Sequence, residues 1–178
     1  MRSRTALATA TLCLIVLGGC SSKNIIEEKT RNVSALRTTG SYYVMPLEVT
    51  FKPPQAWEIS EAEWKDWVDT WKIDFREEMR NECYKTLEFP ESAEGLDGAV
   101  VRCEIYEMDK GGFSGFGGNG FARAHITIVD LDGKTIYDAK LEGTGANSGF
   151  ESTVVRGRMK FAVLNLARQI SDVMEDGE

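Results

Sequence analysis

A regular apolar stripe over residues 60–87 constrains the fold more than any other feature of this chain. The run Ser60-Glu61-Ala62-Glu63 fits the capping box S-x-x-E, which predicts that a helix starts there. Apolar residues then recur at three- and four-residue spacing, as they do on one face of a helix. They are Trp64, Trp67, Val68, Trp71, Phe75, Met79, Cys83 and Leu87. We expect this stripe to cover a sheet or a neighbouring subunit, because a helix with one apolar face needs a surface to pack on.

The remaining segments predict strands and a second helix. Residues 41–51 are rich in aromatic and β-branched residues, although Pro46 marks an irregularity. Residues 99–108 and 121–131 alternate between apolar and polar, and residues 134–141 follow the turn at Asp132-Gly133 as a hairpin partner. A last apolar stripe predicts a closing helix with Val155, Met159, Ala162 or Val163, Leu166, Ile170 and Val173. The predicted order is β-α-β-β-β-α, an α/β (α+β) sandwich with a mixed sheet of about four strands and two long amphipathic helices packed on it.

The N-terminus has the features of an export signal. Two arginines precede an almost wholly apolar run from Thr5 to Val16, which is too short to span a bilayer. The motif Leu17-Gly18-Gly19-Cys20 follows and resembles a bacterial lipobox, which implies cleavage before Cys20 and acylation of its thiol. Several acyl chains make a stable anchor. Ser21 follows the cysteine, where an Asp would suggest inner-membrane retention, so we expect an outer-membrane lipoprotein facing the periplasm.

These features divide the chain into three parts: a lipoprotein signal peptide over residues 1–19, a lipidated cysteine and tether over 20–39, and one α/β domain over 40–178. Loss of Arg2 and Arg4 with the signal lowers the 21 basic residues to 19, against 28 acidic ones, a net charge near −9. A chain this acidic is poorly suited to nucleic acid, whose phosphates require clustered Lys and Arg.

Two cysteines remain in the predicted domain. Cys83 lies on the apolar stripe of the first helix, and Cys103 lies on the apolar side of the strand over 99–108. They could form a disulfide in an oxidising compartment or remain two free buried thiols, and both readings stay open.

The run Gly115-Phe116-Gly117-Gly118-Asn119-Gly120 matches the dinucleotide fingerprint G-x-G-x-x-G. A nucleotide site needs a helix directly after that motif, and here an alternating strand follows. We therefore predict no nucleotide and no cofactor. The run is interpreted as a loop between two strands, with Phe113, Phe116 and Phe121 as a candidate interaction surface toward the domain's own sheet, a second subunit, an envelope partner, or lipid or glycan.

His125 is the only histidine of the chain, and no Cys or His lies at metal-ligand spacing from it. A Ser-His-Asp hydrolase would have to use His125. Its place in the middle of a strand favours a histidine on the sheet surface, so we predict no metal and no enzyme. A periplasmic hydrolase using His125 is the alternative.

The whole layout resembles a bacterial lipoprotein family known only as a domain of unknown function. The resemblance rests on the lipobox, the glycine run from Gly111 to Gly120, and the segment "ARAHITIVDLDGKTIYDAKLEGTGANSG" with Asp130, Gly133 and Lys134 at its hairpin. The layout is similar, more distantly, to the α/β domain of outer-membrane assembly lipoproteins, such as curli secretion and exopolysaccharide-export accessory proteins. These resemblances imply oligomers and partner binding without catalysis. We expect a non-catalytic binding or assembly lipoprotein of the envelope, with an envelope protein or its own copies as partner.

Overall fold

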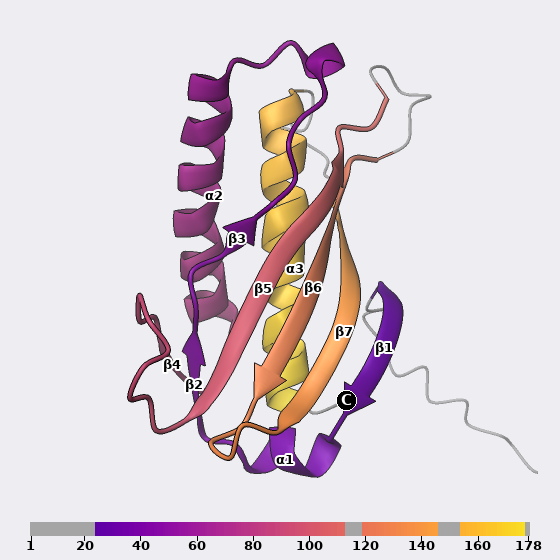
Figure 1. The fold of residues 1–178 in the computed structure, drawn as a ribbon. Coiled ribbons are helices and arrows are strands. Elements are labelled where there is room, and N and C mark those ends of the chain that lie inside the picture. The colour runs from indigo at the N-terminus through magenta and orange to yellow at the C-terminus, as the bar shows by residue number, and fades with distance from the viewer. Residues whose placement is uncertain (1–23, 113–118, 146–153, 177–178) are drawn as a thin grey trace, which may run out of the picture.

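The computed structural model describes residues 24–112, 119–145 and 154–176. Figure 1 shows a sheet with two long helices behind it and at its side. The elements are β1 (Ile25–Arg31), α1 (Val33–Thr38), β2 (Ser41–Val44), β3 (Glu48–Val49), the 3-10 turn η1 (Gln55–Trp57), α2 (Glu61–Glu82), β4 (Thr86–Glu88), β5 (Ala99–Asp109), β6 (Phe121–Val129), β7 (Thr135–Thr144) and α3 (Val155–Asp176).

The sheet is mixed, as predicted, but it is larger than the expected four strands. In the described part of the chain it has seven strands in the order β1-β7-β6-β5-β2-β4, with β3 paired to β5. The strands β5, β6, β7 and β1 pair antiparallel, whereas β2, β3 and β4 join in parallel. The additional strands are short or polar, so no clear alternation marked them in the sequence.

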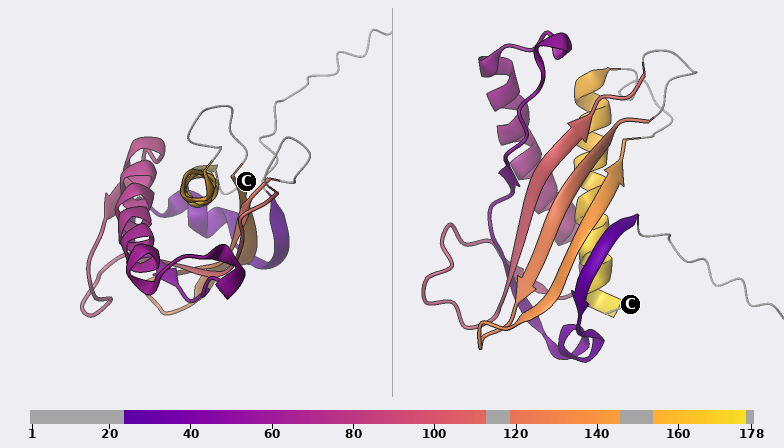
Figure 2. Two further views of the ribbon diagram at one scale, coloured as in Figure 1. Left: turned by 90° about the horizontal axis from the view of Figure 1, so that it is seen from above. Right: turned by 45° about the vertical axis from the view of Figure 1, so that its right-hand side comes forward.

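The helices cover one face of the sheet. Seen from above, α3 and α2 lie on the same side of the strands (Figure 2). The helix-facing residues of β6 are fully buried, and so are the central residues of the predicted α3 stripe. These core residues include Ala122, Ala124, Ile126, Ile128, Met159, Ala162, Leu166, Ile170 and Val173. The prediction of helices packed on a sheet is confirmed.

The capping box of α2 forms as predicted. The Ser60 hydroxyl accepts the Glu63 backbone N–H at 3.2 Å, and the Glu63 carboxylate accepts the Ser60 backbone N–H at 3.1 Å. The helix ends earlier than the apolar stripe does: Cys83 is its extended C-cap, and Leu87 lies in β4. The last residue of the predicted helical stripe therefore belongs to a strand.

The tryptophans of α2 pack into an aromatic cluster. Trp71 is fully buried, and the Trp64 ring lies 5.3 Å from it and 5.9 Å from Phe51, centroid to centroid. Trp57 and Trp67 complete the cluster on either side of Trp64. These rings belong to the core and its margin, as expected for the stripe.

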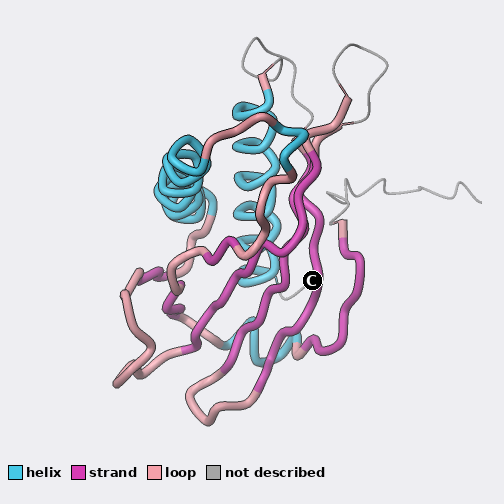
Figure 3. The backbone as a smooth tube through the Cα atoms, turned by 45° about the horizontal axis from the view of Figure 1, so that its top comes forward, coloured by secondary structure: helices cyan, strands magenta, loops and turns pink. Residues whose placement is uncertain are grey.

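The tether expected over residues 20–39 is corrected by the structure. Residues 25–31 form β1 at one edge of the sheet (Figure 3), and residues 33–38 form α1, whose Leu36 is fully buried. The pairing of β1 with β7 is irregular at two positions, between Ile25 and Glu27 and between Glu28 and Thr30. These irregularities interrupt the two-residue period by which a strand is recognised in sequence.

Two smaller differences have local causes. The segment 41–51 is split into β2 and β3 around Pro46, which has no N–H to donate to a neighbouring strand. Strand β7 extends to Thr144, beyond the expected end at Leu141, because Gly143 and Thr144 pair with β6. The bare backbone of Gly143 also lets α3 approach closely, since a Cβ there would overlap the Ala162 carbonyl oxygen and lie 2.8 Å from Leu166 Cγ.

The turn at Asp132-Gly133 is confirmed. Gly133 has a φ of 76°, which favours glycine, and its N–H donates to the Asp130 carbonyl at 3.0 Å. Among the described residues, no helix has both the length and the apolar character needed to cross a bilayer.

Candidate functional site

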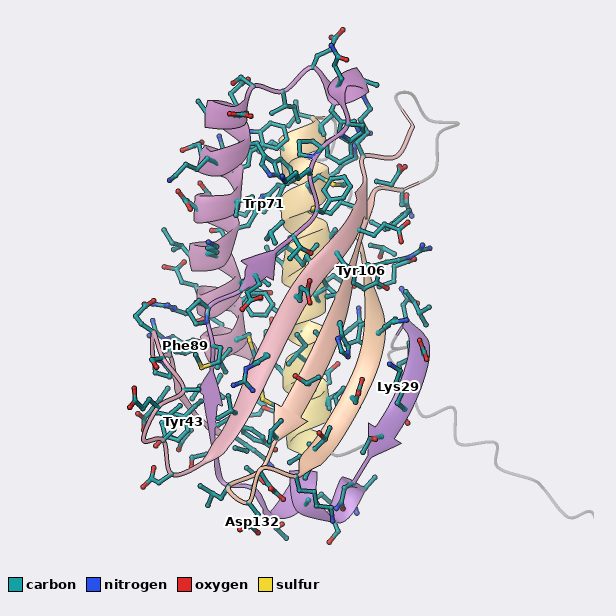
Figure 4. The ribbon with its side chains drawn as sticks, in the orientation of Figure 1. Lys29, Tyr43, Trp71, Phe89, Tyr106 and Asp132 are labelled. Atoms are coloured by element: carbon teal, nitrogen blue, oxygen red, sulfur yellow. The ribbon has the colours of Figure 1, made fainter. Side chains whose placement is uncertain are left out.

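The face of the sheet opposite the helices is the strongest candidate for a functional surface. No element in the described part of the chain covers it, and it faces the viewer in Figure 4. Its side chains form three rows across the strands, because residues directly opposite one another lie on the same face. We call this surface the open face. The rows are Glu107-Arg123-Glu142, Glu104-His125-Lys140-Glu27 and Arg102-Thr127-Asp138-Thr30.

Arg123 joins the first row. Its Nε donates to Glu142 Oε2 at 2.9 Å, and its Nη1 donates to the two Glu107 carboxylate oxygens at 3.0 and 3.1 Å. The hydrogen bond to Glu142, and to a smaller extent the hydrogen bond to Glu107, raises the pKa of the Arg123 guanidinium. The same guanidinium lies 4.4 Å from the centroid of the Phe121 ring, a cation–π contact. The Arg123 guanidinium therefore joins β6 to both of its neighbours, β5 and β7, and also contacts the Phe121 ring.

The second and third rows meet at His125. Its Nε2 lies 2.8 Å from Asp138 Oδ1, on the diagonal neighbour in β7. Directly opposite His125 are Glu104 on β5 and Lys140 on β7. The histidine is on the sheet surface, where the sequence placed it, with a carboxylate partner that the sequence did not indicate.

Lys140 extends the charged array to the edge strand. Its Nζ lies 2.7 Å from Glu27 Oε2 on β1. The hydrogen bond between them lowers the pKa of Glu27 and raises the pKa of Lys140. At the β5 end of the same row, the Thr50 hydroxyl donates to Glu104 Oε1 at 2.9 Å.

The open face is suited to recognition more than to stabilisation of the fold. The Arg123 and His125 side chains are each 34% exposed, so water weakens their polar contacts with the neighbouring carboxylates. Pairs of this kind contribute about 1 kcal/mol or less each. Each row contains both acidic and basic side chains, so the face presents donors and acceptors close together. Among the described residues, no group of three or more His, Cys, Asp or Glu side chains could hold a metal ion.

The predicted site residues are distributed between this face and the core. Phe121 lies at the end of β6 on the open face, half-buried beneath Arg123. Phe113, Phe116 and Cys20 lie outside the described residues. Cys83 and Cys103 are both free and buried, and burial raises the pKa of each thiol.

The aspartates near the hairpin have different roles. Asp130 Oδ1 accepts the backbone N–H groups of Asp132 and Lys134 at 3.1 and 2.9 Å, which is ordinary turn chemistry. Asp138 lies on the open face with His125. Sequence reasoning missed this pairing, although charged residues at alternate positions of β5, β6 and β7 were a visible signal of a polar face.

No protein-family model matches the chain, and no curated protein matches it by sequence. Solved structures do show similarity. One is the PelC dodecamer from Paraburkholderia phytofirmans, at 15% identity over 80% of this chain and 95% of that one, with a TM-score of 0.45. Another is protein XCC0632 from Xanthomonas campestris, described as a DUF330 protein, at 6% identity over 84% of this chain and 91% of that one, with a TM-score of 0.49. Similarity at this level identifies no residue of the open face.

Proposed function

We propose that this chain is a bacterial lipoprotein of the cell envelope, anchored by acyl chains on Cys20 in the outer membrane and facing the periplasm, with a non-catalytic binding role. The motif Leu17-Gly18-Gly19-Cys20 supports the anchor. Mass spectrometry of the mature protein should show a chain that begins at an acylated Cys20. The Cys20→Ala variant should accumulate as the uncleaved precursor without acyl mass, and a soluble mature chain that begins elsewhere would contradict the anchor.

The binding role is carried by one observation, the open face. It is a continuous polar surface across β5, β6, β7 and β1, and it carries charges of both signs. Such a surface complements another protein surface with charges of both signs. The acidic balance of the chain disfavours a polyanion as the partner. We therefore assign the open face to a protein partner in the envelope.

Crosslinking in intact cells tests this assignment. A photoreactive residue at Thr127, near the centre of the open face, should give discrete crosslinked species. The same residue at Glu77, exposed on α2, is the matched control. A species of twice the chain's mass identifies a second copy, and a different mass identifies another envelope protein. Crosslinks from Glu77 alone, or products that contain only lipid or glycan, would reject the open face as a protein-binding surface.

A hydrolase remains the second candidate, because Asp138 holds His125 at 2.8 Å as an orienting carboxylate would. The residues directly opposite His125 carry no hydroxyl or thiol nucleophile, since they are Glu104 and Lys140. Replacement of His125 by Ala separates the two roles. If the protein is a hydrolase, the His125→Ala variant should lose the cellular phenotype while crosslinking from Thr127 persists. If the open face binds a protein, the same variant should show weaker crosslinking from Thr127.

A further inference from the structure

The described part of the domain begins at Asn24, four positions after Cys20. The Asn24 backbone N–H donates to Gln169 Oε1 at 3.1 Å, and the Asn24 carbonyl accepts the Glu142 backbone N–H at 2.8 Å. The Gln169 side chain is itself 6% exposed and donates to the Glu142 carbonyl and to Asn165 Oδ1. Asn24 is thus held on both sides, by β7 and by α3.

The segment between Cys20 and Asn24, which we call the leash, is short. Only residues 21–23 lie between them, so four Cα–Cα links of about 3.6 Å span at most about 14 Å. The sheet is wider than this leash, because five inter-strand spacings of about 4.8 Å separate β1 from β4, roughly 24 Å. Asn24, directly before β1, therefore stays close to the membrane surface.

We propose that the outer edge of β1 lies against the lipid headgroup layer, an inference that rests on the proposed acylation of Cys20. Ile26 is 48% exposed on this edge, and Lys29 is exposed beside it (Figure 4). The Lys29 ammonium can pair with lipid phosphates, and Ile26 can contact the apolar margin of the headgroups. Individually weak contacts suffice, because a short leash keeps their effective concentration high.

The alternative occupant, an added strand, fits this edge less well. The two irregularities in the pairing of β1 interrupt the row of backbone groups that another strand would need. Exposed charges at Glu27, Glu28 and Lys29 also oppose strand addition. A membrane surface needs no backbone register.

Headgroup quenching of a fluorescent label tests the orientation. The acylated protein, labelled at Ile26→Cys or at the matched control Glu88→Cys on the opposite edge strand β4, is placed in phosphatidylethanolamine and phosphatidylglycerol vesicles that carry a headgroup quencher. We expect at least threefold stronger quenching at position 26 than at position 88. Equal quenching at the two positions, or stronger quenching at position 88, would overturn the inference.

An extended leash supplies the second arm. Insertion of ten Gly and Ser residues between Ser22 and Lys23 should bring the two labels close to equal quenching, and a ratio that survives the insertion refutes the leash as its cause. Acyl mass on Cys20 is measured first on the same samples. Its absence defeats the proposed function, whereas equal quenching with the acyl chains present defeats only the orientation.

Discussion

The buried carboxamide of Gln169 accepts the backbone N–H of Asn24 across 145 positions of the chain. The same side chain donates to the Glu142 carbonyl at 2.9 Å, so one residue of α3 ties together the start of β1 and the end of β7. This arrangement makes β1 part of the domain and fixes the position of Asn24 against β7 and α3.

Replacement of Gln169 by Leu should leave the Asn24 N–H without its acceptor. Because a hydrogen bond contributes about 0.5–1.5 kcal/mol and the substitution also removes the bond to the Glu142 carbonyl, the free energy of unfolding in urea should fall by about 1–3 kcal/mol. Amide hydrogen exchange at residues 24–28 should accelerate at least tenfold. Lys65→Gln is the control, since it removes an exposed ion pair with Asp69 and should leave the free energy of unfolding nearly unchanged. Equal stability of the two variants would show that Gln169 does not hold β1.

Replacement of Gly143 by Ala should separate α3 from β7. The added Cβ would overlap the Ala162 carbonyl oxygen, a backbone atom that cannot move without the helix. We expect a loss of about 1–3 kcal/mol in the free energy of unfolding, as is usual for an overpacked core. At Gly40 an added Cβ meets no heavy atom within 4 Å, so Gly40→Ala should change stability by only about 0.5 kcal/mol. A Gly143→Ala variant as stable as Gly40→Ala would contradict the close approach.

Stability should fall in alkaline solution between about pH 10 and pH 12. Burial raises the pKa of both Tyr42 and Tyr137 to about 12, above the value near 10 of an unfolded tyrosine. Because the folded state disfavours the phenolate, the stability conferred by these groups is complete below pH 10 and is lost as the pH rises through the folded pKa. Urea unfolding at pH 9 and pH 11 measures the loss.

The double variant Tyr42→Phe/Tyr137→Phe should remove much of this alkaline dependence. At neutral pH the two substitutions should differ. The Tyr42 hydroxyl donates to the Leu36 carbonyl at 3.0 Å, and the buried Tyr137 hydroxyl has no hydrogen-bond partner within the described structure. Tyr42→Phe should therefore cost about 1 kcal/mol and Tyr137→Phe close to nothing. An unchanged slope in the double variant would mean that other groups cause the alkaline loss.

The thiols of Cys83 and Cys103 should be protected but not bonded. Both side chains are at most 7% exposed, and burial raises the pKa of each thiol, so little reactive thiolate is available. A thiol reagent should label neither cysteine in the native protein and both in denaturant without a reductant. Labelling in denaturant that appears only after reduction would establish a disulfide instead.

Local patterns predicted the elements whose residues interact mainly within one segment. The capping box and stripe predicted α2, a second stripe predicted α3, and alternation with an Asp-Gly turn predicted β5, β6 and β7. Cap hydrogen bonds and side-chain periodicity depend on residues a few positions apart, so they are legible in sequence. The end of α2 was predicted less well, because apolar residues continue past Cys83 into the next strand.

The site was only partly predictable for the same reason. Arg123, His125 and Asp138 could each be assigned to a strand, and His125 to its surface. Which charge lies opposite which depends on strand register, and register is set by core packing on the other face. Phe121 was predicted both as the first residue of a strand and as part of an interaction surface; it is the first residue of β6, and its contact with Arg123 was not indicated by the sequence.

From the sequence alone one recognises the lipobox-like motif at Cys20, the acidic balance, two long helices and three main strands, because these depend on composition and on near neighbours. Tertiary structure alone decided that residues 25–31 belong to the sheet, that Gln169 holds Asn24, and that Arg123 joins Glu107 to Glu142. Each of those contacts pairs segments distant in the chain, and their geometry exists only once the helices have packed on one face of the sheet and left the other open.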